Sequence, residues 1–236
     1  MGTIKQGILG GFSGKVGTVV GGSWKSIHYM RALAVSVRNP RTVPQVLQRR
    51  RFTLAVDFAK TVAPFLRIGY GRYAKGQSAY NAAVSYILLH AMTGSSDNIR
   101  LDYRKLLVAR GNLVAATGAA VEVTTGKADF SWTDNSGMGD ASPDDQVLLL
   151  VYNKTRKEAV YSTSAGSRAD ASAELALPAD WEEEPLAVYL AFCNPSDGYA
   201  SNSVCLQDDA DNTEPEPGGG SGETGGETGG GEDPLG

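Results

Sequence analysis

The sequence predicts an α+β fold, with a Gly-rich β-hairpin and two helices followed by a seven-stranded antiparallel β-sandwich. Three observations lead to this prediction. Glycine recurs through the first 38 residues, apolar residues then recur every three or four positions, and the apolar period changes to two near residue 98. The expected organisation is a basic hairpin and helical module over residues 1–110, the sandwich over 111–206 and a disordered acidic Gly-rich tail over 207–236.

The glycine-rich segment at the start is the first element. The stretch GKVGTVVGGSWKSIHYMRALAV alternates β-branched or aromatic residues with small or polar ones. Such alternation is typical of strands, and glycine adopts the backbone conformations that tight turns require. We therefore expect a twisted β-hairpin between Met1 and Arg38.

Two helices are predicted after the hairpin. Pro40 disfavours helical backbone at the residue before it, and Thr42 followed by Gln45 forms a capping box, so the first helix is expected to begin there. A second helix is expected from Ser78 to about Met92. A stripe at helical spacing runs along the first helix and consists of Leu47, Arg51, Leu54, Phe58, Val62 and Phe65.

Strand-like runs with a period of two occupy the chain from about residue 98. The last seven of these runs are short, regularly spaced and separated by turn sequences such as TDNSGMGD and NPSDG, which is typical of a β-sandwich. The expected runs are 99–103, 106–109, 119–124, 128–132, 147–152, 158–162, 171–177, 186–193 and 199–206.

Several motifs together resemble an uncharacterised bacterial and prophage domain-of-unknown-function family. They are GGFSGKVGTVVGGSWKSIHYMR, RNPRT followed by Gln45, Gln48, Arg49, Arg51 and Phe52, RGNL at 110–113, and FSWTDNSG followed by VLLLVYN. The resemblance covers residues 1–206. It implies that the sandwich is of the fibronectin type III or immunoglobulin-like kind and that the protein is associated with a phage or prophage virion. No catalytic residue follows from it.

The charge of the chain is distributed unevenly. The net charge is −4, but residues 1–110 contain 17 Lys and Arg against three Asp, a balance of +14, whereas the remainder contains five against 23, a balance of −18. Nine of those carboxylates lie in residues 207–236, which have almost no apolar residues and cannot fold alone. A basic half of this kind requires a negatively charged partner, which is nucleic-acid phosphate, the acidic half of another copy, or the sandwich and tail of the same chain.

Motifs that indicate a reaction are absent from the sequence. The GGFSGK segment has one residue too few between its glycines for a phosphate-binding loop, and Val16 stands where a magnesium-binding hydroxyl is needed. His28 and His90 have no partner at metal-ligand spacing. Cys193 is expected opposite about Ala200 in a hairpin, which disfavours a disulfide with the second cysteine. We expect no enzyme activity, no cofactor and no metal.

Aromatic and acidic side chains in the sandwich have two interpretations. Trp132 and Trp181 are expected in the core rather than on a sugar-binding platform. The acidic runs at 144–145 and 182–184 are expected to be solvated loop charge rather than calcium ligands.

The function expected from the sequence is that of a non-enzymatic structural or interaction protein that self-assembles or docks on a protein partner. Nucleic-acid binding by the basic half is the alternative, and a carbohydrate-binding module is a more distant one. The sequence lacks a membrane span and a signal peptide, so we expect a cytoplasmic or virion-associated protein with no membrane partner. The residues expected to contact a partner or nucleic acid are Lys15, Trp24, Lys25, Arg38, Arg41, Arg49 and Arg50.

Overall fold

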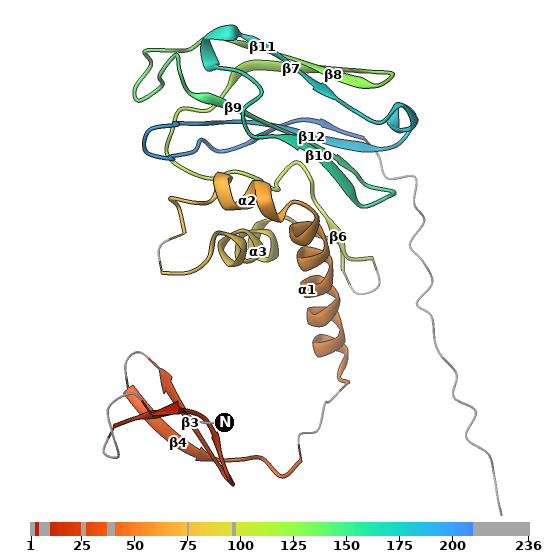
Figure 1. The fold of residues 1–236 in the computed structure, drawn as a ribbon. Coiled ribbons are helices and arrows are strands. Elements are labelled where there is room, and N and C mark those ends of the chain that lie inside the picture. Colours follow the sequence, from red (N-terminus) through yellow and green to blue (C-terminus); the bar gives the residue numbers. More distant parts are fainter. Residues whose placement is uncertain are drawn as a thin grey trace, which may run out of the picture. The chain divides into compact units, whose positions relative to one another are not determined.

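The computed structural model of the chain describes residues 3–4, 10–24, 27–36, 41–74, 76–95 and 98–209 (Figure 1). The chain divides into two units, Met1–Val46 and Leu47–Gly236, which are described separately. The predicted α+β class is confirmed, because helices and antiparallel sheets occupy different parts of the sequence. The acidic tail expected from residue 207 begins inside the last strand, and residues 210–236 lie outside the described residues.

The N-terminal unit contains a four-stranded antiparallel sheet rather than the predicted hairpin. Its strands follow chain order: β1 (Thr3–Ile4), β2 (Phe12–Val16), β3 (Val19–Trp24) and β4 (Ile27–Ala32). The prediction recognised the strand pattern but not the number of strands. A two-residue loop at Gly17 and Thr18 joins β2 to β3, and Gly17 has a φ of 57°, a conformation that glycine adopts without strain.

The described residues form three α-helices where two helices were predicted. They are α1 (Val43–Thr61), α2 (Ala63–Gly69) and α3 (Ala79–His90). The first begins directly after Thr42, as expected, and Ser78 caps the last by accepting a hydrogen bond from the Asn81 backbone. The extra helix arises at Pro64, which has no N–H to continue the hydrogen-bond series of α1 and instead stands in the first turn of α2.

The helices bury one side against a sheet. Phe58, Val62 and Phe65 of the predicted stripe are fully buried, together with Ala83 and Ile87 of α3. The same core contains the strand residues Leu148, Leu150, Tyr152, Ala187, Tyr189 and Ala191. A domain boundary was expected after residue 110, but residues before and after this position belong to one hydrophobic core.

Two antiparallel sheets follow the helices. A four-stranded sheet has the order β10 (Glu158–Ser162), β9 (Gln146–Asn153), β12 (Leu186–Cys193) and β13 (Val204–Asp208). A three-stranded sheet has the order β11 (Ser172–Ala176), β8 (Lys127–Thr133) and β7 (Thr117–Thr124). A further short pair, β5 (Met92–Thr93) and β6 (Arg100–Leu101), stands where a longer run was predicted, and the apolar run 106–109 forms a buried loop rather than a strand.

The four-stranded sheet is the middle layer of this unit, between the helices and the three-stranded sheet (Figure 1). Alternate residues of β9 face opposite ways, so Leu148 and Leu150 belong to the helix-facing core while Val147, Leu149 and Val151 belong to the core between the sheets. Both faces are covered, which explains why the strand is an almost unbroken apolar run.

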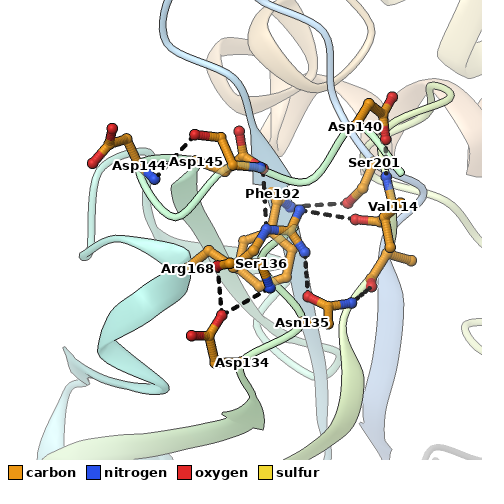
Figure 2. A network of polar contacts seen from close by, with 12 residues as sticks. Val114, Asp134, Asn135, Ser136, Asp140, Asp144, Asp145, Arg168, Phe192 and Ser201 are labelled. Atoms are coloured by element: carbon orange, nitrogen blue, oxygen red, sulfur yellow. Dashed lines mark hydrogen bonds and ion pairs between the residues drawn. The ribbon is translucent and has the colours of Figure 1, made fainter. Parts of the chain in front are cut away.

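A buried arginine holds one end of the sandwich (Figure 2). Arg168 and Asp145 are both fully buried, and the Arg168 Nε lies 3.0 Å from the Asp145 Oδ2. The Arg168 Nη1 and Nη2 donate to the Asn135 side-chain oxygen at 2.6 Å and to the Val114 carbonyl at 2.9 Å. The guanidinium carbon lies 3.8 Å from the centre of the Phe192 ring. The charge is tolerated because the guanidinium is paired and hydrogen-bonded on every nitrogen.

The cysteines behave as the sequence predicts. Cys193 pairs with Ala200 in an antiparallel bridge, and Cys205 lies on β13 opposite Tyr189. Both thiols are free. Trp132 and Trp181 are buried, which confirms their predicted place in the core.

Candidate interaction surface

The N-terminal sheet has large apolar side chains and almost no core. Among its described residues only Gly21 is buried. Trp24, Ile27 and Met30 are 64%, 65% and 72% exposed. A sheet normally buries one apolar face to be stable, and within its own unit this one buries neither.

Within the sheet, two aromatic rings pack closely against glycine residues. Gly22 lies directly across from Tyr29 in the β3–β4 pair, and a Cβ at Gly22 would lie 2.9 Å from the end of the Tyr29 ring. The Phe12 ring lies over Gly21 in the same way, since a Cβ at Gly21 would lie 2.5 Å from a carbon of that ring. Each ring therefore lies against the backbone of a glycine, without forming a core.

The last strand of the sheet is an edge. All six residues of β4 are exposed, and β4 pairs with β3 on one side only. An edge strand offers unpaired N–H and C=O groups to another strand. Apolar side chains and backbone groups are thus available on the same element.

The predicted contact residues fall into both units. Lys15 on β2, Trp24 at the end of β3 and Arg41 before α1 are exposed in the N-terminal unit. Arg49 and Arg50 are exposed on α1 in the second unit. Lys25 and Arg38 lie outside the described residues. The structure therefore assigns Lys15, Trp24 and Arg41 to one unit and the two helical arginines to the other.

The N-terminal unit is positively charged, whereas the segment that follows the helices is negatively charged. Residues 1–46 contain six Lys and Arg and no Asp or Glu. The segment 111–206 contains 14 Asp and Glu against five Lys and Arg. Most of these carboxylates are exposed, including Asp134, Asp140 and Asp144 in one loop. The two segments carry charges that attract each other.

The sequence predicted the basic residues of this surface and Trp24, but not its other exposed apolar residues, which are Val16, Ile27, Met30, Leu33 and Val35. The alternating pattern places side chains on the two faces of a strand but does not say whether anything covers a face. One signal was available, because a segment with eight glycines in its first 22 residues has few side chains with which to build a core.

The described residues show no arrangement of chemical groups typical of an active site. No group of three or more His, Cys, Asp and Glu side chains lies close enough there to hold a metal ion. None of the helices in the described part of the chain is both long enough and apolar enough to cross a membrane. The uncovered basic sheet is therefore the best-defined candidate site in the N-terminal unit.

The fold and this surface describe an α+β protein with an exposed N-terminal sheet and a pair of antiparallel sheets, one of which is covered by helices. Residues 11–207 match the family described as "Family of unknown function (DUF6266)", and the chain belongs to that family. A search of curated proteins found no match.

Proposed function

We propose that this chain is a non-enzymatic structural protein that assembles copies of itself through its N-terminal sheet. The observation that supports the proposal is the uncovered sheet, because large apolar side chains are exposed on it and its edge strand β4 is exposed along its whole length. Burying such a surface in a neighbouring molecule removes apolar area from water and satisfies the edge.

The partner surface is the acidic sandwich of a second copy. The N-terminal 46 residues carry only positive charge, so two such sheets repel each other, whereas the 14 carboxylates of segment 111–206 attract them. A sheet that binds a different surface on the next copy makes a head-to-tail contact, which forms rings or open filaments.

The sandwich serves as the spacer of this assembly. Strand orders of β7-β8-β11 and β10-β9-β12-β13 support a fibronectin type III-like arrangement with its two antiparallel sheets. A phage or prophage virion is the context we propose, on the basis of the motif resemblance alone. The buried tryptophans Trp132 and Trp181 are not available for a sugar platform, so nothing favours a carbohydrate-binding module.

Sedimentation velocity of the full chain tests the proposal. We expect oligomers at 0.1 M salt that dissociate toward 1 M salt, because the Debye length shortens from about 10 Å to about 3 Å over that range. Met30→Ser on β4 should weaken assembly. Leu89→Ser on α3 is the matched control, since Leu89 is 74% exposed and Met30 is 72% exposed. A chain that is monomeric at every salt concentration, or a control that weakens assembly equally, would contradict the proposal.

Nucleic-acid binding is the second candidate, favoured by the exposure of Lys15, Arg41, Arg49 and Arg50. Arg49 and Arg50 are successive residues, so they point about 100° apart and only one of them can face a given backbone. Fluorescence anisotropy with labelled single-stranded DNA should give a plot of log K against log salt with a slope of about −0.7 per phosphate neutralised. Arg49→Ala with Arg50→Ala should flatten the slope, and Arg67→Ala on α2 is the control. An equal slope in all variants excludes Arg49 and Arg50 as the contact.

A further inference from the structure

A cavity in the second unit lies where the turn after α2, the RGNL segment and the chain between β12 and β13 meet. Its volume is about 400 Å³, and two arginines and two tyrosines line it: Arg72, Tyr73, Arg110 and Tyr199. Asn112 adds a polar side chain to the same wall. These residues lie outside the N-terminal sheet through which we propose that the chain assembles.

Arg110 is held between two aromatic rings. Its guanidinium carbon lies 4.3 Å from the centre of the Tyr73 ring and 4.7 Å from the centre of the Tyr86 ring. The Arg110 backbone N–H donates to the Gly69 carbonyl at 2.8 Å, which fixes the residue to the end of α2. Stacking of this kind holds a guanidinium in one orientation, with its N–H groups free to bind a ligand in the plane of the group.

Arg72 approaches the cavity from the turn after α2. Its Nε donates to the Asp197 carbonyl oxygen at 2.6 Å, and its guanidinium carbon lies 5.9 Å from the centre of the Tyr199 ring. The Asp197 carboxylate instead accepts a hydrogen bond from the Tyr199 backbone at 2.9 Å. In the described part of the chain neither Arg72 nor Arg110 has a carboxylate within ion-pair distance, whereas Arg104 and Arg168 each have one and Arg156 has two.

The floor of the cavity is fixed by backbone contacts. The Leu113 N–H donates to the Ala200 carbonyl at 3.2 Å, and the Ser203 N–H donates to the Ala109 carbonyl at 3.0 Å. Gly111 between them has no room for a side chain, because a Cβ there would lie 2.0 Å from the Ala200 oxygen. These hydrogen bonds hold the segment that carries Arg110 against the chain before β13, which carries Tyr199.

We propose that this cavity binds a phosphate monoester whose organic part lies against the tyrosine rings. Two guanidiniums without acidic partners match the charge of about −2 and the three free oxygens of such a group better than the single charge and two oxygens of a carboxylate. The cavity is larger than a phosphate alone, and the half-exposed rings of Tyr73 and Tyr199 offer flat apolar surface to the rest of the ligand.

Isothermal titration calorimetry of the full chain tests this proposal with three probes: adenosine 5′-monophosphate, adenosine and succinate. We expect saturable binding of the monophosphate that weakens as salt rises, and much weaker binding of the other two. Arg110→Gln should weaken monophosphate binding by about tenfold or more, since hydrogen bonds to charged groups are the strong ones. Arg110→Lys should restore little, because a lysine keeps the charge but not the planar stacked fork.

Matched controls separate binding from folding and assembly. Arg67→Gln removes the same charge from an exposed position on α2 that does not line the cavity, and it should leave affinity unchanged. Circular dichroism melting checks that Arg110→Gln remains folded, and Arg72→Gln is a second variant that should also weaken binding. The proposal is overturned if the monophosphate does not bind at millimolar concentration, if adenosine or succinate binds equally well, or if folded Arg110→Gln and Arg72→Gln both bind like the original chain.

Discussion

Arg110 and Arg168 both lie beside aromatic rings, yet their surroundings give them different roles. Arg168 is fully buried and each of its three side-chain nitrogens donates to a protein oxygen, so a ligand in solution cannot reach its guanidinium. Arg110 is only partly buried and stacks on Tyr73 and Tyr86 without an acidic partner. The presence or absence of a carboxylate therefore separates a structural arginine from one that is available for binding.

Removing one member of the buried ion pair should destabilise the sandwich strongly. Arg168→Met leaves the Asp145 carboxylate buried without its partner, and we expect a loss of about 3–5 kcal/mol in the free energy of unfolding. Urea denaturation followed by tryptophan fluorescence measures it. Arg156→Met is the control, because Arg156 pairs with Asp180 and Glu184 at the surface and should cost at most about 1 kcal/mol. Equal losses in the two variants would show that the buried ion pair contributes no more to the free energy of unfolding than the surface pairs do.

The thiol of Cys205 should react slowly in the folded protein. Burial is the main cause that raises its pKa from the ordinary 9.0 to about 11, and the Asp208 carboxylate raises it further. The thiolate is the reactive form, so the rate should rise with pH up to about 11 when folded and level off near 9 when unfolded. Iodoacetamide labelling at pH 8, followed by mass spectrometry, should be at least about tenfold faster in urea. Equal rates in the two states would contradict the inference.

At the scale of elements, the sequence predicts some strands residue for residue and misses others for a physical reason. The runs 158–162 and 186–193 coincide with β10 and β12, because turn residues bound them on both sides. The run 106–109 has the same apolar character but is a loop, since its burial comes from packing against α2 rather than from a sheet. The break between α1 and α2 was missed because the apolar stripe continues through Val62 and Phe65 on both sides of it.

A small-to-large substitution tests the packing of α2 on that loop. A Cβ at Gly69 would lie 2.6 Å from the Val108 carbonyl oxygen and 2.9 Å from the Ala109 Cα, both of which are backbone atoms. Gly69→Ala should therefore lower the free energy of unfolding by about 1–3 kcal/mol, although alanine is the better helix former. Gly166→Ala is the control, because its Cβ would meet only the end of the Asp170 side chain at 3.1 Å. If chemical denaturation shows no difference between the two, the loop has room to move.

At the scale of the whole molecule, the candidate site could be predicted only in part. Counting charges identified the basic half, and the structure places Lys15, Trp24 and Arg41 in a unit that bears an uncovered apolar sheet. The cavity of Arg72 and Arg110 could not be predicted, because its walls come from three segments that are far apart in a chain of 236 residues. Only the tertiary contacts bring the RGNL segment to the chain before β13.

Truncation tests which parts of the chain fold together and which part assembles. A fragment of residues 47–209 retains both sheets, α2, α3 and all of α1 except its first four exposed residues, so it should unfold cooperatively and with the melting temperature of the full chain. It lacks the basic sheet, so it should also stay monomeric at low salt. Circular dichroism and light scattering measure the two properties. A fragment that is folded but still self-associates would remove the N-terminal sheet from the assembly contact.

A shorter fragment provides the contrast. Residues 111–209 keep both sheets but lose the helices that cover Leu148, Leu150 and Tyr189 on the middle sheet. Exposing this contiguous apolar face costs about 25 cal/mol for each Å² returned to water. The shorter fragment should therefore bind the dye ANS, melt at lower temperature than residues 47–209 and aggregate. If it is instead monomeric and as stable as the longer fragment, the sandwich folds independently of the helices, and the boundary expected after residue 110 is a true domain boundary.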